Sequence, residues 1–233
     1  MEYHATGCIL CGSPLKYFDV QRMQECSLCH RQVLSNACCE EGHFICDRCH
    51  AGAAVDISLD ICMKSISTDP AEILTALMSV SGIHMHGPEH HVLVGSALLA
   101  ACRNAGAEID MPKAIQELRN RAGMVPGGAC GAWGTCGAAV SCGIAYSVLH
   151  KTSPLSEEYW ALGNKLTSEC LSAIAKHGGP RCCKRDGYSA LIAASDFIRK
   201  HDGIKIKVAK KPVCIFNQNN HQCLGKKCPY HKG

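Results

Sequence analysis

The stretch "EHHVLVGSALLAAC", from Glu89 to Cys102, decides the fold that we expect for this chain. After its two histidines, nearly every position is apolar or small, so a helix built from it would have no polar face. A helix of this kind is buried on all sides, which requires several other helices around it. The stretch is far shorter than the roughly 20 apolar residues that span a bilayer. It therefore predicts a buried helix in a soluble helical body, with no membrane as a partner.

Capping residues and glycines indicate further helices on both sides of this stretch. Asp69 and Pro70 are typical of a helix start, and Gly82 ends that helix. Pro88 begins the central helix, which ends near Gly106. Further helices are expected at 110–123, 135–150, 153–178 and 186–201. This region has no alternating strand pattern and no internal repeat, so we expect a mostly α protein.

Composition divides the 233 residues into three parts. Residues 1–62 hold nine cysteines and few helix signals, residues 63–205 are the predicted helices, and residues 206–233 return to turns, lysines and cysteines. The expected architecture is a compact helical body with an N-terminal cysteine-rich, zinc-ribbon-like head that contains short strands. The basic, cysteine-containing tail is expected to pack on this body.

Charge and cysteine usage limit the class of protein. The net charge of +4 is uneven, because nine lysines and arginines but only one aspartate follow residue 198. This basic end is compatible with nucleic acid, with a small anion or with a solvated tail, and nucleic acid is the less favoured partner. The start of the chain does not have the pattern of a secretory signal. We therefore expect a cytoplasmic protein whose cysteines stay reduced and bind metal.

Two CxxC pairs in the head predict a metal site. Cys8, Cys11, Cys26 and Cys29 could supply four thiolates to a structural zinc, with a rubredoxin-like iron as the alternative. A third pair suggests a second zinc whose ligand set stays open. Its candidate ligands are Cys46 and Cys49 with Cys38, Cys39, His43 and His50.

The stretch "HMHGPEHH", residues 84–91, gathers four histidines at the start of the buried helix. Its HxxEH pattern does not predict a zinc protease, because Pro88 keeps Gly87 out of the helix and so separates His86 from His90. We expect a loop of metal-binding histidines at a helix N-terminus, where the dipole favours neutral imidazole. The candidate ligands are His84, His86 and either His90 or His91.

The glycine-rich stretch 127–142 contains three cysteines and precedes a predicted helix. Cys130 and Cys136 can converge where that helix begins, whereas Cys142 points elsewhere and is expected in the core. The later stretch "RCCK", residues 181–184, adds two thiols between cations that would lower thiol pKa values and could hold a small anionic substrate. We therefore expect one reactive centre built from Cys130, Cys136, Arg181, Cys182, Cys183 and Lys184.

The tail contributes Cys214, Cys223 and Cys228, the last followed by proline as in many iron–sulfur ligand runs. Three cysteines need a fourth ligand or leave one iron open, as a [4Fe–4S] cluster can, and the sequence leaves the cluster type open. The candidates for the fourth ligand are Cys182, Cys183 and His231. The remaining cysteines, Cys62, Cys102 and Cys170, are expected as small buried residues.

Several motifs together resemble an uncharacterised cysteine-rich family of anaerobic bacteria and archaea, a domain of unknown function. They are "FICDRCH", "HMHGPEHH", "CGAWGTCGAA", "GGPRCCKRD" and "QCLGKKCP". The glycine-rich "CGA" with a later cysteine pair is also similar to redox-active proteins named for a cysteine–glycine–alanine signature. Neither resemblance brings an activity that can be transferred to this chain.

The residues support three functional hypotheses. The favoured one is a cytoplasmic zinc and iron–sulfur protein that transfers electrons or sulfur in anaerobic metabolism, with a redox or sulfur-transfer partner that the sequence does not identify. The second is a non-catalytic zinc module that binds a protein or nucleic acid. The third is a metal-dependent enzyme that uses the histidines of residues 84–91.

Overall fold

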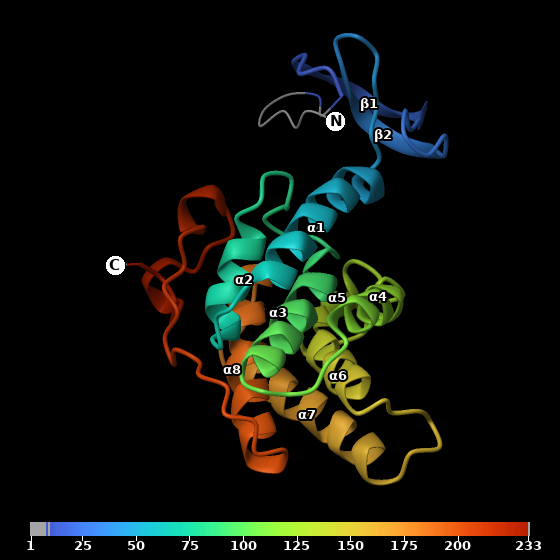
Figure 1. Cartoon of the computed structure of the whole chain (residues 1–233). Coiled ribbons are helices and arrows are strands. Elements are labelled where there is room, and N and C mark those ends of the chain that lie inside the picture. The colour runs from blue at the N-terminus through green and yellow to red at the C-terminus, as the bar shows by residue number, and fades with distance from the viewer. Residues whose placement is uncertain (1–7, 9, 233) are drawn as a thin grey trace. The chain divides into compact units, whose positions relative to one another are not determined.

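The computed structural model describes residues 8 and 10–232 and divides into two compact units (Figure 1). The first unit, Met1–Asp56, is called the head below, and the second, Ile57–Gly233, is called the body. Helix α1 (Asp47–Lys64) crosses the division and also contains the expected boundary at residue 62. The tail segment 206–233 belongs to the same unit as the helices.

The head contains one antiparallel hairpin, which confirms the short strands expected there. Strand β1 (Leu15–Glu25) pairs with β2 (Gln32–Cys39), with Leu15 opposite Cys39 at one end and Glu25 opposite Gln32 at the other. An isolated two-stranded hairpin is marginally stable in water. Its apolar cluster is small, because three of the four buried residues in it are cysteines: Cys26, Cys38, Phe44 and Cys46. The head therefore needs another source of stability.

The body is helical, as expected. Its helices are α2 (Pro70–Met78), α3 (His90–Asn104), α4 (Met111–Ala122), α5 (Ala129–Ala132), α6 (Gly137–Leu149), α7 (Glu158–Ala175) and α8 (Cys183–His201). Helix α3 lies at the centre and packs against α2, α4, α6 and α8 (Figure 1). Every residue of α3 from His90 to Cys102 is buried, which confirms the central helix predicted from this stretch.

A glycine brings α3 and α6 into close contact near their starts. The Gly95 N–H donates to the hydroxyl of Ser141 at 2.8 Å, and that hydroxyl donates to the carbonyl of His91. A Cβ atom on Gly95 would lie 2.9 Å from the backbone carbonyl oxygen of Ser141, so a larger residue would push the helices apart. This contact holds the first turns of both helices side by side.

Several helices differ from the sequence expectation. Helix α8 begins at Cys183 and not at residue 186, so part of "RCCK" forms its first turn. Helix α7 begins at Glu158, because the hydroxyl of Ser156 accepts from the Ser153 N–H in a preceding turn. Helices α1 and α5 were not expected. Cys49 lies in the first turn of α1, and its N–H donates to the carbonyl of Cys46, which directly precedes the helix.

The tail is anchored at several points along the body. The Lys207 N–H donates to the carbonyl of Thr68, and the Ala209 N–H donates to the carboxylate of Asp69 at 3.0 Å. That carboxylate also caps α2. Two 3-10 turns, Asn217–Asn219 and Gly225–Lys227, carry the tail back over the start of α8. None of the helices in the described chain combines the length and the apolar character needed to cross a membrane.

Candidate metal and thiol sites

The head contains two clusters whose geometry suits a metal ion. In each, four ligand atoms lie within 4.8 Å of one another, and no other set of described residues reaches this spacing. The first, called the histidine-containing cluster, consists of Cys8, Cys11, Cys39 and His43. Its His43 Nδ1 lies 3.4 Å from Cys11 Sγ, and Cys11 Sγ lies 3.9 Å from Cys39 Sγ.

The second, called the all-cysteine cluster, consists of Cys26, Cys29, Cys46 and Cys49. Cys29 Sγ lies 3.7 Å from Cys46 Sγ, and the Cys46 N–H donates to Cys26 Sγ at 3.4 Å. Both ligand sets are those of closed, four-coordinate structural sites. The head can therefore hold two metal ions.

This grouping corrects the expectation of one site at Cys8, Cys11, Cys26 and Cys29. The hairpin explains the difference, because β1 lies between the two CxxC pairs and carries them to opposite ends of the sheet. The first pair meets the last residue of β2, Cys39, and His43 just after it, whereas the second pair lies in the hairpin turn and meets Cys46 and Cys49. The four ligand pairs therefore alternate along the chain between the two clusters.

The expectation for Cys38 also requires a correction. Successive residues of a strand point to opposite faces, so Cys38 and Cys39 cannot both reach one ion. Cys39 belongs to the histidine-containing cluster, whereas Cys38 packs against Cys26, Phe44 and Cys46. The side chain of His50 lies outside what the structure describes.

Thiol pKa values in the all-cysteine cluster move in opposite directions. Burial, followed by the neighbouring thiols of Cys29 and Cys46, raises the pKa of Cys49 to about 12. Burial also acts to raise the pKa of Cys26, but backbone N–H groups, chiefly that of Cys46, bring it down to about 6. Four thiols this close cannot all ionise unless a cation neutralises them. A bound metal cation would therefore stabilise the thiolate form of all four cysteines.

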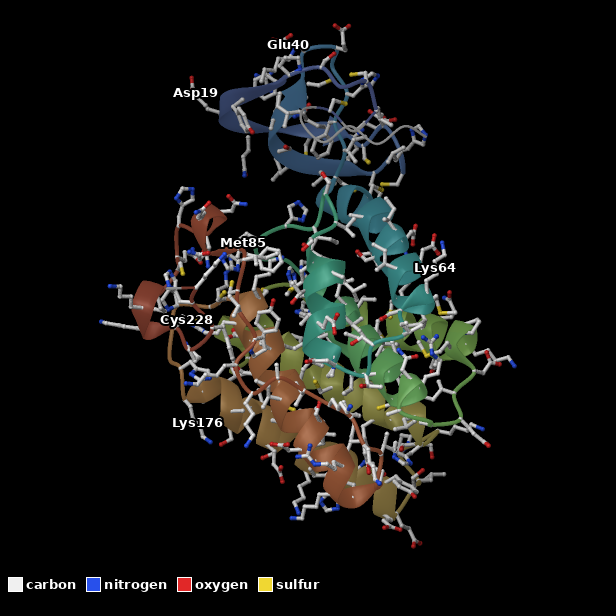
Figure 2. The ribbon with its side chains drawn as sticks, turned by 60° about the vertical axis from the view of Figure 1, so that its left-hand side comes forward. Asp19, Glu40, Lys64, Met85, Lys176 and Cys228 are labelled. Atoms are coloured by element: carbon white, nitrogen blue, oxygen red, sulfur yellow. The ribbon has the colours of Figure 1, made fainter. Side chains whose placement is uncertain are left out.

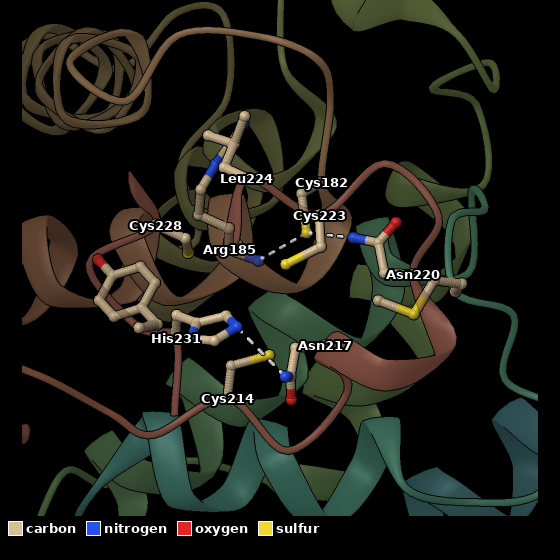
Figure 3. Close-up of a pocket in the computed structure, with 11 residues that line it drawn as sticks. Cys182, Arg185, Cys214, Asn217, Asn220, Cys223, Leu224, Cys228 and His231 are labelled. Carbon is tan, nitrogen blue, oxygen red and sulfur yellow. Dashed lines mark hydrogen bonds between the residues drawn. The ribbon is translucent and has the colours of Figure 1, made fainter. Parts of the chain in front are cut away.

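In the body, four cysteines from distant segments line one small pocket, called the tail centre below. They are Cys182, Cys214, Cys223 and Cys228, the four residues expected to hold a cofactor. His231, an expected candidate ligand, lines the same pocket (Figure 3). Figure 2 labels Cys228 and Met85, which reaches this pocket from the loop before α3.

Hydrogen bonds reach three of the four sulfur atoms of the tail centre. Cys182 Sγ accepts from the Arg185 N–H at 3.5 Å and from Asn220 Nδ2 at 3.6 Å (Figure 3). Cys214 Sγ and Cys223 Sγ each accept, at 3.4 Å, from the N–H two residues further along the chain. Such bonds stabilise negative charge on sulfur and are typical of metal-bound cysteines.

Three other cysteines form a second site, called the thiol cavity below. Cys130, Cys136 and Cys183 line a cavity of about 180 Å³ together with Arg181 and Asp186. Its other lining residues are His86, Gly87, Pro88, His90, His91, Gly127, Gly128, Ala129, Gly137 and Ala138. The structure thus brings together four of the six residues expected at the reactive centre.

The adjacent cysteines Cys182 and Cys183 face different sites, which corrects the expectation of a single centre. Cys182 has extended dihedral angles as the N-cap of α8, whereas Cys183 is the first helical residue. Their side chains therefore diverge, toward the tail centre and the thiol cavity respectively. His86 connects the two sites, because its Nδ1 accepts from the Cys183 N–H at 3.5 Å and its Nε2 lies 3.2 Å from Asn220 Oδ1.

The expected lowering of the thiol pKa values by nearby cations and helix N-termini is wrong for the cysteines that the structure buries. Burial, followed by the charge of Asp186, raises the pKa of Cys136 to about 12. Burial raises the pKa of Cys183 to about 11 and also raises that of Cys182. Desolvation of a thiolate therefore outweighs the cations, and a bound cation or a change at the site is needed to ionise these thiols.

Lys184 lines neither site. It is 1% exposed, and its Nζ donates to the carbonyl of His84 and to His90 Nε2, both at 3.0 Å. Burial lowers the pKa of Lys184 to about 8. The ring of Phe216 lies 4.8 Å from this Nζ. Lys184 thus joins the histidine loop to α8 and the tail, a role that its sequence context did not reveal.

The histidines of residues 84–91 are held by hydrogen bonds to the protein. His90 Nδ1 donates to the carbonyl of Gly87 at 3.0 Å, so both of its ring nitrogens have partners. His84 Nδ1 lies 3.1 Å from the carboxylate of Glu89, and both nitrogens of His86 are engaged as described above. No three described ligands that include His84, His86 or His90 are close enough to share an ion. Their geometry favours a positioning role for the loop.

Comparison with known proteins identifies the family but no activity. A model of a family of unknown function, DUF5714, matches residues 59–231. No curated protein and no solved structure matches the chain. The matched segment contains every residue of the tail centre and of the thiol cavity, and it contains none of the head ligands. This chain belongs to the DUF5714 family of unknown function.

Proposed function

We propose that the chain is a zinc and iron–sulfur protein of electron or sulfur transfer, with an iron–sulfur cluster at the tail centre beside the thiol cavity. The observation that carries the proposal is the convergence of Cys182 with Cys214, Cys223 and Cys228 on one pocket. Thiolate ligands favour soft metals and iron–sulfur clusters over hard cations. The two head clusters would hold structural zinc.

The spacing of the sulfur atoms favours a cluster over a single ion. In the described chain, the tail centre contains no three ligand atoms within 4.8 Å of one another, unlike the two head clusters. A cluster of several irons holds its cysteines further apart than one ion does. The pocket measures about 20 Å³, roughly the space of one or two water molecules. The two 3-10 turns of the tail would therefore have to move outward to admit the cluster.

His231 is suited to complete the ligand set or to stabilise it. Its Nδ1 is buried and has no hydrogen-bond partner in the described chain, whereas its Nε2 lies 3.3 Å from Asn217 Nδ2. A buried polar atom without a partner costs free energy unless a ligand satisfies it. This supports a group bound within reach of the ring.

A connection between the tail centre and the thiol cavity supports a redox role. The hydrogen bonds run from Cys182 Sγ through Asn220 and His86 to the backbone of Cys183. A cluster held at the tail centre would therefore lie one hydrogen-bonded network away from Cys183, whose thiol lines the cavity where a substrate could bind. The nineteen unpaired cysteines suit a reducing, anaerobic cytoplasm.

Anaerobic purification of the wild type and of Cys223→Ser tests this proposal. We expect iron, acid-labile sulfide and visible absorbance in the wild type and their loss in the variant, with unchanged zinc. Cys170→Ser is the matched control, because Cys170 is buried in the helical core, where it donates to the carbonyl of Ala190, and it lines neither the tail centre nor the thiol cavity. Zinc at the tail centre, or iron that survives in Cys223→Ser, would contradict the proposal.

A further inference from the structure

The thiol cavity has the size of a small molecule. Its volume is about 180 Å³, whereas pockets for drug-sized ligands begin at about 300 Å³. An engineered apolar cavity of about 150 Å³ holds benzene. The space of the thiol cavity itself therefore fits a ligand of a few non-hydrogen atoms.

The electrostatics of the cavity favour a negative ligand. Helices α3, α6 and α8 all begin at its wall, and a helix N-terminus carries partial positive charge. Arg181 is exposed and lines the cavity. Asp186 is the only carboxylate among the described lining residues, and the buried Arg185 neutralises it at 2.9 Å without lining the cavity itself. The balance at the wall is therefore positive.

The chemistry of the wall favours a ligand with a soft atom. Three thiols line the cavity, whereas none of the described lining residues has a hydroxyl or amide side chain. Sites that recognise a hard oxyanion such as phosphate use such groups together with cations. A contact between two sulfur atoms is more favourable than one between sulfur and a hard donor, because sulfur is polarisable.

A buried histidine at the cavity wall has one ring nitrogen without a protein partner in the described chain. His91 is 8% exposed, and its Nδ1 donates to the carbonyl of Val125 at 3.1 Å. Its Nε2 therefore carries the lone pair and has no hydrogen bond in the described chain. This nitrogen lies against Gly137, where a Cβ atom would come within 2.1 Å of it. A bound anion would favour protonation of the ring, which could then donate to the ligand.

The cavity has a route to solvent. An open groove of about 520 Å³ shares four of its lining residues, namely Cys130, Cys136, Arg181 and Asp186. A ligand that enters from the groove thus passes the arginine before it meets Cys183. Cys130 and Cys136 also line the groove, so the ligand meets the arginine together with these two thiols and reaches Cys183 last.

We propose that the thiol cavity binds a small sulfur anion, an oxyanion with a terminal sulfur atom. Its oxygens lie toward Arg181 and the start of α6, and its sulfur lies among Cys130, Cys136 and Cys183. This inference goes beyond the proposed function, because it names a ligand class for a site separate from the tail centre. It does not require that a cluster be present.

Isothermal titration under anaerobic conditions tests the inference with thiosulfate as the probe and sulfate as its match in charge and shape. We expect one thiosulfate site per chain, with binding at least about tenfold tighter than that of sulfate. Arg181→Gln should weaken the binding of thiosulfate, whereas Arg199→Gln, at the other end of α8, should not. Cys136→Ser and Cys183→Ser should each remove the preference for thiosulfate, whereas the buried Cys62→Ser should preserve it.

Three results would overturn the inference: no thiosulfate binding, equal binding of both anions, or full thiosulfate preference in both cavity variants. Loss of iron from Cys136→Ser would also overturn it, because the cavity would then hold metal. Thermal unfolding followed by tryptophan fluorescence shows that each variant is folded. Iron content of the same samples separates failure of this inference from failure of the proposed function.

Discussion

The head and the body use cysteine in different ways. In the head, each cluster takes its ligands in pairs spaced by two or three intervening residues, and the ligand atoms lie within 4.8 Å. In the body, the tail centre joins residue 182 to residues 214–228, and the sulfur atoms lie further apart. The head sites are therefore local and fitted to one ion, whereas the body sites depend on how whole helices pack.

This difference predicts opposite roles for metal in stability. The buried apolar cluster of the head is small, and two of its four buried residues, Cys26 and Cys46, are metal-ligand cysteines, so little else stabilises the head. The body has a central helix that is buried from His90 to Cys102. We expect the head to need its ions in order to fold, and the body to fold without a ligand.

Removal of metal should give the largest effect. Structural zinc supplies roughly 10–16 kcal/mol of apparent binding free energy in small zinc domains, so a chelator should unfold the head. Both tryptophans, Trp133 and Trp160, lie in the body and report on it alone. Far-ultraviolet circular dichroism and head amide signals should change, while the tryptophan unfolding midpoint stays constant. A shift of the tryptophan unfolding midpoint on metal loss would show that the stability of the body also depends on metal.

Single ligand substitutions sharpen the same comparison. Cys39→Ser and Cys49→Ser should each lose about one equivalent of metal, because they belong to different clusters. Cys38→Ser is the matched control, since Cys38 neighbours a ligand but packs in the apolar cluster. Metal analysis of purified proteins checks this. Retention of both ions in Cys39→Ser would contradict this assignment and support a site formed by the two CxxC pairs alone.

Acid should weaken the body through its buried histidines. Burial and then the charge of Lys184 lower the pKa of His90 to about 3, below its ordinary value near 6.5. The unfolded state therefore binds more protons between these two pH values, and stability falls as pH falls through that window. One such group contributes up to about 1.4 kcal/mol per pH unit.

Urea unfolding at about pH 7 and about pH 5, followed by tryptophan fluorescence, measures this acid sensitivity. His90→Gln should show a smaller loss of unfolding free energy than the wild type, because it cannot take up the proton. His221→Gln, at an exposed position of the tail, should behave as the wild type does. An identical pH dependence in His90→Gln would show that this residue does not couple protonation to folding.

A more local effect is expected from a methyl group at the cavity. Gly137→Ala would place a Cβ atom 2.1 Å from the ring of His91, whereas a Cβ atom on Gly131 would meet nothing within 4 Å. We expect Gly137→Ala to destabilise the body by about 1–3 kcal/mol and Gly131→Ala to leave it unchanged or slightly more stable. Thermal unfolding by tryptophan fluorescence checks both. Equal stability of the two variants would mean that α3 and α6 separate easily.

The sequence predicts the helical body well, because the apolar stretch of α3 and caps such as Asp69 act locally. It also predicts which cysteines gather in the body, since glycines and helix starts accompany Cys130, Cys136 and Cys183. It does not predict which cysteine pairs share a metal ion in the head, because the hairpin decides which of these pairs lie close together. Nor does the sequence predict that Cys182 and Cys183 belong to different sites, since this depends on the extended dihedral angles of Cys182.

Burial is the other quantity that the sequence does not supply. Arg181, Lys184 and Arg185 stand beside the cysteine pair in the sequence, but Lys184 and Arg185 are buried with partners of their own. The net effect on Cys183 is a raised pKa, because desolvation exceeds the attraction of the cations. Only the packed structure shows which of two opposing local effects is larger.

X-ray absorption at the zinc and iron edges of one anaerobic sample tests the central claim most directly. The account predicts seven sulfur and one nitrogen ligands over two zinc ions, from the histidine-containing and all-cysteine clusters of the head. At the iron edge it predicts sulfur ligands and iron–iron scattering, which Cys214→Ser removes while the zinc edge stays unchanged. Absence of iron–iron scattering in the wild type, or a change at the zinc edge in Cys214→Ser, would contradict the account.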